Sequence, residues 1–140
     1  MADMIMLSVD YGDRRTGIAC CDNKGLICYP VTVINDGYEK RVIEKVSEIA
    51  KEKGAERIVV GLPKNMDGSE GFRAKACEEF ALKLKEVSGI ETVLYDERLT
   101  TVYAHKALNF TDTRGKKRKE VVDALSAVVI LEDYLKSLKN

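Results

Sequence analysis

The chain has 140 residues, and its 23 Lys and Arg residues balance 23 Asp and Glu residues, so the formal net charge is zero. This length predicts one domain spanning residues 1–140, and 45% hydrophobic with 33% charged residues is typical of a globular protein, not of a disordered or fibrous one. Zero net charge argues against a generally basic nucleic-acid coat protein, although it permits a local basic patch.

The sequence also argues against membrane insertion, secretion and a zinc site. The N-terminal apolar stretch Met4–Val9 has six residues, whereas a membrane span needs about 20 and a signal peptide needs a longer apolar region. The four cysteines (Cys20, Cys21, Cys28 and Cys77) form no C-x-x-C pair and are accompanied by a single histidine. We therefore expect a cytoplasmic protein whose thiols are small core side chains.

Strands and helices alternate along the chain. Short apolar runs predict strands, and apolar residues three and four apart predict helices. The predicted elements are strands at Met4–Asp10, Thr16–Asp22 and Leu26–Ile34, a helix at Tyr38–Lys53, a strand at Arg57–Leu62, a helix at Ser69–Val87, a strand at Glu91–Glu97, and helices at Thr100–Leu108 and Lys117–Leu138. This order, βββαβαβαα, predicts an α/β domain with a mixed five-stranded sheet and helices on both faces.

The second helix allows a more detailed prediction. Ser69 is expected to be its N-cap, because a Ser side chain can accept a hydrogen bond from a free backbone N–H of the first turn. Its inner face is expected to carry Phe72, Ala76, Phe80, Leu84 and Val87.

Three acids stand where the local pattern favours apolar residues. Asp10 ends the first predicted strand and Glu97 ends the last one. Ligands of open α/β sheets bind in the crevice beyond the carboxyl ends of the parallel strands, so these two acids are expected to face one site. Taken alone, Asp10 is better explained as a residue that caps a turn.

Asp123 lies within the stretch Val121–Leu131, where nine of eleven residues are apolar. A helix that is apolar nearly all round is buried, and an ionised carboxylate in it is costly unless it is paired or bound to a metal. The presence of Asp123 is explained equally well by a favourable interaction with the dipole at the helix N-terminus, or by pairing with a buried Arg.

The combination of the three acids favours a metal site. Three converging carboxylates repel one another, and two Mg²⁺ ions together with one phosphodiester would bring the total charge to zero. Two such ions, roughly 4 Å apart, activate a water and stabilise the leaving oxygen of an in-line displacement.

Four blocks of the chain resemble the YqgF/RuvX family, the pre-16S ribosomal RNA nucleases. Residues 10–19 read DYGDRRTGIA and resemble the family's opening D-x-G-x-x-R-x-G-x-A block. Residues 59–71 (VVGLPKNMDGSEG), 96–101 (DERLTT) and 123–135 (DALSAVVILEDYL) resemble the next three blocks. The likeness runs from about Met4 to Leu138, and Ser126 departs from the Ala that the family usually has.

This resemblance implies an RNase H-like fold, which Holliday junction resolvases and retroviral integrases share. It also implies Asp10, Glu97 and Asp123 as catalytic, metal-binding acids, with Mg²⁺ or Mn²⁺ as the cofactor.

Several other residues are candidates for binding the substrate. Arg15 and Arg98 lie near the acids in the sequence and are each able to clamp a phosphate. The alternatives are that Arg98 pairs with Asp96 or Glu97 and orients it, and that Arg15 is simply solvated. Asn65 lies in the loop before the second helix, whose free N–H groups attract anions. Residues 114–119 hold five basic side chains in six positions, including Lys116, Lys117, Arg118 and Lys119, which favours contact with a phosphate backbone.

The leading hypothesis is therefore a metal-dependent phosphodiesterase that acts on structured nucleic acid and trims the 5′ end of precursor small-subunit ribosomal RNA. The ribosomal RNA assignment comes from the resemblance alone. Expected partners are precursor rRNA or branched DNA and pre-ribosomal particles, for a monomer or a homodimer. Alternatives are a Holliday junction resolvase, a non-catalytic RNA- or ribosome-binding module and, ranked last, a nucleotide-binding domain.

Overall fold

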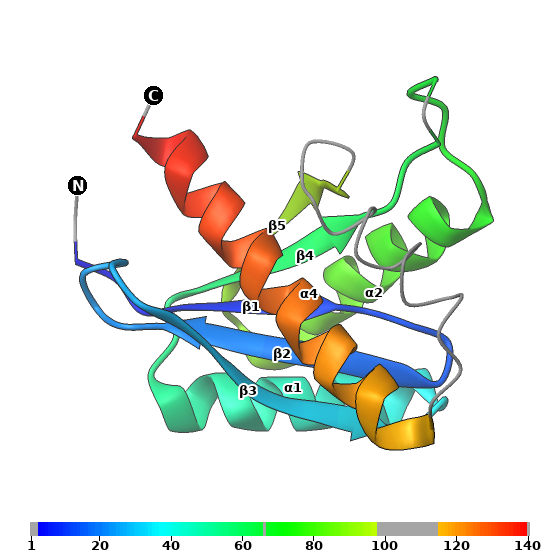
Figure 1. The fold of residues 1–140 in the computed structure, drawn as a ribbon, viewed down its shortest axis with the longest axis horizontal. Helices are drawn as coiled ribbons and strands as arrows, with labels where there is room; N and C mark the ends of the chain where they lie inside the picture. Colours follow the sequence, from blue (N-terminus) through cyan, green and yellow to red (C-terminus); the bar gives the residue numbers. More distant parts are fainter. Residues whose placement is uncertain (1–2, 66, 98–114, 140) are drawn as a thin grey trace.

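The structure is a computed structural model that describes residues 3–65, 67–97 and 115–139, with the side chains of residues 115–122 left out of the description. Five strands form one sheet in the order β3-β2-β1-β4-β5. β1 pairs with β2, and β2 with β3, in antiparallel fashion, whereas β1–β4 and β4–β5 are parallel (Figure 1). The strands are β1 (Met6–Asp10), β2 (Arg15–Cys21), β3 (Cys28–Asn35), β4 (Arg57–Leu62) and β5 (Glu91–Asp96).

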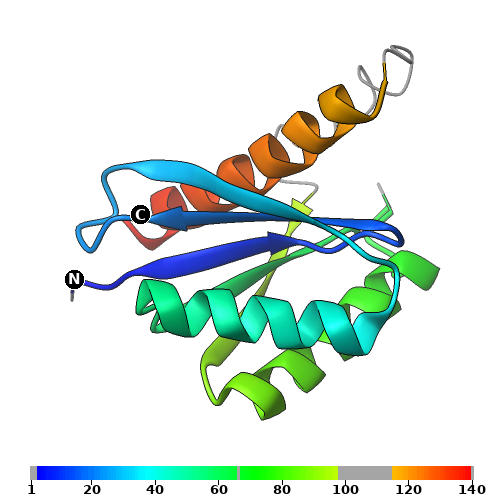
Figure 2. The same ribbon diagram turned by 90° about the horizontal axis from the view of Figure 1, so that it is seen from below.

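Helices cover both faces of this sheet, as predicted. α1 (Glu39–Lys53) and α2 (Phe72–Ser88) lie on one face, and α4 (Gly115–Leu138) crosses the other (Figure 2). Each face has its own apolar cluster, the larger one beneath α1 and α2 and the smaller one beneath α4. None of the helices within the described ranges has the length and apolarity needed to cross a membrane.

The alternation of side chains in β1 explains why there are two clusters. Leu7 and Val9 point into the cluster under α1 and α2, whereas Met6 belongs to the cluster under α4. Successive side chains of a strand point to opposite faces, so Ser8 and Asp10 share the α4 face with Met6. The alternation in β1 therefore places the Asp10 carboxylate on the α4 face, at the end of the strand.

The structure corrects the prediction for the second helix. α2 begins at Phe72 with Gly71 as N-cap and without a side-chain cap, so Ser69 is not the N-cap. Phe72 is 84% and Val87 53% exposed, and neither belongs to the core. The buried face consists of Ala74, Cys77, Phe80, Ala81, Leu84 and Ser88. Phe80 and Leu84 are buried as predicted, whereas small residues at the two ends of the helix, Ala74 and Ser88, are buried in place of Phe72 and Val87.

The final helix also differs from its prediction. α4 begins at Gly115, two residues before the expected start, and Leu125 is 50% exposed. The helix is therefore one-sided in this region and not buried all round, which weakens the burial argument for Asp123. The helix predicted at Thr100–Leu108 lies outside the described residues. The four cysteines are described, and all of them are free thiols.

Candidate active site

Asp10 lies at the carboxyl end of the central strand, on the face that α4 covers. The Ser8 hydroxyl, two residues earlier on the same face, donates a hydrogen bond of 2.6 Å to the carbonyl oxygen of Ala127 in α4. Asp10 itself is 6% exposed. Its carboxyl group is therefore buried close to α4, in the position predicted from the end of the strand.

Glu97 directly follows β5 and is 5% exposed. Its side chain reaches back over Gly61 of β4: a Cβ atom at Gly61 would lie 2.5 Å from Oε1 of Glu97 and 2.8 Å from Cδ1 of Ile130 in α4. The Glu97 carboxylate thus lies on the α4 face, over β4. A side chain at Gly61 would occupy the space that this carboxylate needs.

The strand register brings these two acids to neighbouring positions. Val9 of β1 is paired with Val60 of β4 in parallel register, so Asp10 and Gly61 follow one step further along their strands. Because Glu97 reaches from the end of β5 over Gly61, its carboxylate lies over β4, the strand next to the one that carries Asp10, on the same face.

Asp123 reaches the same region from α4. A Cβ atom at Gly17 of β2 would overlap the backbone carbonyl of Asp123, so the absence of a side chain at Gly17 lets the helix lie directly on the strand. Gly17 is the register partner of Asp10 in the β1–β2 pair. β1, β5 and α4 therefore bring residues 10, 97 and 123 to one face of the sheet, at the end where β1, β4 and β5 terminate.

Arg15, the first residue of β2, forms an ion pair with Asp123. Its Nε donates a hydrogen bond of 2.7 Å to Oδ2 of Asp123, and the two side chains are 31% and 19% exposed. The residues are 108 positions apart in the sequence. Asp123 is thus paired with an Arg, which was one of the alternatives that the sequence left open. This Arg is Arg15, which the sequence analysis gave as a candidate for binding substrate.

The chemistry of the three acids suits a divalent cation, because carboxylate oxygens are the ligands that Mg²⁺ and Mn²⁺ prefer. Among the residues that the structure describes, no three His, Cys, Asp or Glu side chains are gathered closely enough to form a metal site. One oxygen of Asp123 instead accepts the hydrogen bond from Arg15. The acids therefore share one region without being drawn together around a common point.

The other predicted substrate contacts are less well placed by the structure. Asn65 is exposed, and its Nδ2 donates a hydrogen bond of 3.0 Å to the Ser69 hydroxyl, which in turn donates to Asp67. These bonds hold the loop before α2 in its own internal network. Arg98 lies outside the described residues, and the basic residues 116–119 are in the first turns of α4, where only the backbone is described.

A clamp on the loop after β1 was missed by the sequence analysis. Arg73, in the first turn of α2, donates a hydrogen bond of 2.8 Å to the carbonyl oxygen of Tyr11 and forms an ion pair with Asp13. The Tyr11 ring stacks on Phe80 with 4.0 Å between centroids, and burial raises the pKa of Tyr11. The loop that follows Asp10 is thereby fixed to α2. No signal in the sequence links Arg73 to a loop about 60 residues earlier.

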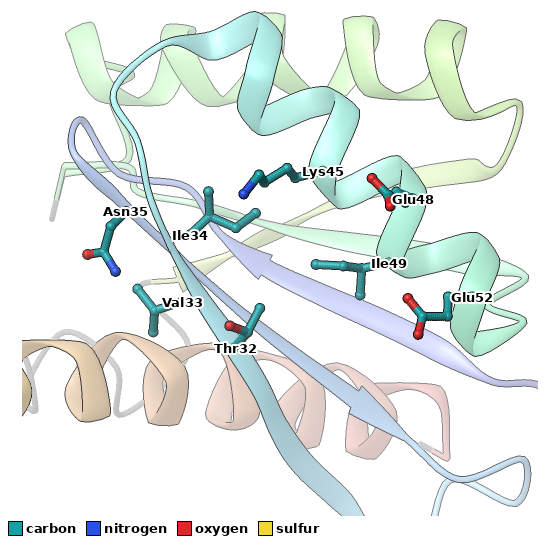
Figure 3. A pocket seen from close by; sticks show the side chains of 8 residues that line it. All are labelled: Thr32, Val33, Ile34, Asn35, Lys45, Glu48, Ile49 and Glu52. Carbon is teal, nitrogen blue, oxygen red and sulfur yellow. The ribbon is translucent and has the colours of Figure 1, made fainter.

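A groove of about 550 Å³ lies elsewhere, between the edge strand β3 and α1 (Figure 3). Its walls are residues 32–35 of β3 and the side chains of Lys45, Glu48, Ile49 and Glu52. None of the three acids lines it, so the groove is separate from the candidate active site.

Comparison with known proteins identifies the family. A family model described as RuvX, Holliday junction resolvase, matches residues 4–137. The chain belongs to the RuvX family. A relative from Bacillus cytotoxicus named "Putative pre-16S rRNA nuclease" is 41% identical over 136 residues, which cover 96% of this chain and 99% of that protein. A relative from Bacillus thuringiensis with the same name is 39% identical over the same length.

Solved structures share the fold of this RuvX family member. RuvC of Thermus thermophilus in complex with a Holliday junction substrate has a TM-score of 0.61 at 12% identity, covering 98% of this chain and 97% of that one. The Fowlpox virus resolvase in complex with Holliday junction DNA has a TM-score of 0.55 at 14% identity, covering 98% and 100%. The family resemblance and the predicted RNase H-like fold are confirmed, and the family's names describe nucleases, which are hydrolases.

Proposed function

We propose that this RuvX family member is a Mg²⁺- or Mn²⁺-dependent nuclease that processes the 5′ end of pre-16S rRNA. The observation that supports the proposal is that Asp10, Glu97 and Asp123 lie in one region of the α4 face, at the end of the sheet where β1 ends. The RNA substrate follows from the names of relatives that match almost the whole chain.

In this proposal the three acids hold one or two divalent cations. When bound, the cations supply an activated water and stabilise the leaving oxygen of the phosphodiester. The protein contributes carboxylates fixed by rigid elements: Asp10 by the central strand, Glu97 by its position over Gly61, and Asp123 by the contact of α4 with Gly17. Burial of Asp10 and Glu97 excludes bulk water and strengthens their interaction with a cation.

The basic run at the start of α4 is proposed to bind the nucleic-acid backbone, together with Arg98 and Asn65. It immediately precedes the part of the helix that carries Asp123, so a bound strand would pass the acids. Precursor rRNA within pre-ribosomal particles is the proposed partner, in the cytoplasm, for a monomeric or homodimeric enzyme.

A second candidate is a Holliday junction resolvase, which the description of the matching family model favours. It would use the same acids on branched DNA. Symmetric cutting of a four-way junction requires a two-fold dimer, because two strands must be cut at equivalent positions. A non-catalytic RNA-binding module is the alternative to both enzymes.

Cleavage assays separate these functions. We would offer the wild-type protein a precursor rRNA leader and a DNA four-way junction, each with Mg²⁺, Mn²⁺ or EDTA, beside Asp10→Asn. The matched control is Glu91→Gln, which changes an exposed acid at the opposite end of the sheet.

The proposal predicts metal-dependent cleavage of the leader RNA by the wild-type protein and Glu91→Gln, and none by Asp10→Asn. Symmetric cutting of the junction alone would instead establish the resolvase. RNA binding without cleavage, equal in wild type and Asp10→Asn, would contradict both enzymes and favour the binding module.

A further inference from the structure

The ion pair between Arg15 and Asp123 stands inside the proposed metal site. Arg15 begins β2 on the face that α4 covers, and its Nε lies 2.7 Å from Oδ2 of Asp123. A charged donor and a charged acceptor make this a strong type of hydrogen bond. One of the oxygens that a cation would need is therefore engaged with a guanidinium.

Electrostatics explains why a cation is needed at this place. Asp10 is the neighbour of Gly17, on which the Asp123 backbone rests, and Glu97 lies over the next strand, so negative charge accumulates on this face. Neighbouring negative charges repel one another, and the repulsion is stronger where water is excluded. The positive charge of Arg15 offsets this repulsion at Asp123.

The position of the Asp123 backbone does not depend on Arg15. It is set by the close approach of α4 to Gly17 and by the hydrogen bond from Ser8 to Ala127. Arg15 is 31% exposed, so its side chain has room to move toward solvent while the helix stays in place. A metal ion can therefore replace the Arg15 guanidinium at Asp123 through motion of the Arg15 side chain alone.

We infer that Arg15 is an internal counter-ion of Asp123 in the metal-free protein, and that a divalent cation that binds Asp123 through Oδ2 must displace its guanidinium. This inference rests on the proposed function, because it takes Asp123 as a metal ligand. Arg15 is then a positioning residue that lowers the metal affinity of the site and keeps the metal-free site folded. Partly exposed ion pairs are weak, so the competition amounts to a factor of up to about five in affinity.

Isothermal titration of Mn²⁺ at fixed ionic strength tests the competition without any assay of activity. We would compare wild type with Arg15→Gln and with Arg41→Gln, a matched control that removes a similar pair to Asp36 on the exposed side of α1. Arg15→Gln is expected to bind Mn²⁺ up to about fivefold more tightly, with Arg41→Gln unchanged. Unchanged or weaker binding by Arg15→Gln would overturn the inference.

A double-mutant cycle separates direct competition from a general effect of charge. The change caused by Arg15→Gln is expected to disappear when Asp123→Asn is already present. An equal tightening in both backgrounds would contradict competition at Asp123. Should Arg15→Gln fail to fold in EDTA, Arg15→Met, which also removes the charge and the Nε donor but keeps an apolar side chain of similar length, must bind Mn²⁺ more tightly than wild type.

The same titrations distinguish this inference from the proposed function. If wild type binds Mn²⁺ and Arg15→Gln has the same affinity, the counter-ion role is wrong while the metal-dependent nuclease stands. If neither protein binds Mn²⁺, both the metal site and the counter-ion role are wrong.

Discussion

Two glycines decide how closely the acids approach one another. Gly17 lets the backbone of α4 rest on β2, and Gly61 leaves the space over β4 into which Glu97 reaches. Both lie inside buried strands, where a glycine weakens the strand unless another group needs the room. At the scale of single residues, the site therefore depends on missing side chains as much as on the carboxylates.

Gly17→Ala is expected to lower the free energy of unfolding by about 3 kcal/mol, because its Cβ would overlap the Asp123 carbonyl and push α4 away. Chemical denaturation and leader cleavage measure the two effects, and cleavage should fall with stability. Gly54→Ala is the control: it has a positive φ of 73° and nothing near its Cβ, so it should cost about 1 kcal/mol and leave cleavage intact. A fully stable and active Gly17→Ala protein would disprove the close contact.

Two buried serines should respond in opposite directions to replacement by Ala. The Ser8 hydroxyl bonds Ala127, whereas the Ser126 hydroxyl, also buried, has no hydrogen-bond partner among the described residues. In urea unfolding, Ser8→Ala is expected to lower the free energy of unfolding by about 1 kcal/mol, and Ser126→Ala is expected to raise it by about 1 kcal/mol. Destabilisation by both would show that Ser126 has a partner in the folded protein.

At the scale of elements, α4 both covers one face of the sheet and carries Asp123, one of the three proposed metal ligands. Its buried residues Ala127, Ile130 and Leu131 pack on the sheet, and Asp123 lies one turn before them. α2 has a comparable double role, since its first turn holds the loop after Asp10 through Arg73. Helices that form the core thus also set the geometry of the site.

Arg73→Gln is expected to slow cleavage by about tenfold, because the loop after Asp10 loses its anchor on α2, as is typical when an outer contact of a metal site is removed. Stability should change by less than about 1 kcal/mol, since the pair with Asp13 is largely exposed. Single-turnover rates and thermal melts measure the two effects. A rate equal to that of wild type, at equal stability, would contradict the anchoring role.

Sequence patterns predict some features of the helices and strands and fail for others. Strand periodicity predicted the order of the elements, the mixed sheet and the end positions of Asp10 and Glu97 well, because these depend on local alternation. It failed at the start of α2 and on its inner face, where Ala74 and Cys77 pack in place of Phe72. Pairing of Asp123 with an Arg was an open alternative, but the identity of that Arg and the anchoring by Arg73 were not predicted, because these contacts join residues 108 and 62 positions apart.

At the scale of the whole molecule, the distribution of charge matters more than its sum. The formal net charge is zero, yet residues 116–119 at the start of the helix that carries Asp123 are all basic. Contacts with a phosphate backbone depend on such local clusters and weaken with salt.

Replacing Lys116, Lys117, Arg118 and Lys119 together by Gln should weaken RNA binding and make its salt dependence shallower, by roughly 3 in the slope of log K against log salt. The measurement is a filter-binding titration at several salt concentrations. The control replaces four lysines of α1, on the opposite face, by Gln: Lys40, Lys45, Lys51 and Lys53. Equal slopes for both variants would show that only net charge is sensed.

The central claim is that Asp10, Glu97 and Asp123 act as one metal-dependent unit. Its most direct test is the single-turnover rate of leader cleavage for Asp10→Asn, Glu97→Gln, Asp123→Asn and the triple variant, at saturating Mg²⁺. Groups that act as a unit lose activity together, so each single variant should fall on the order of a thousandfold, and the triple variant should be no slower than the singles. A single variant that keeps near wild-type activity would remove its residue from the site and contradict the account.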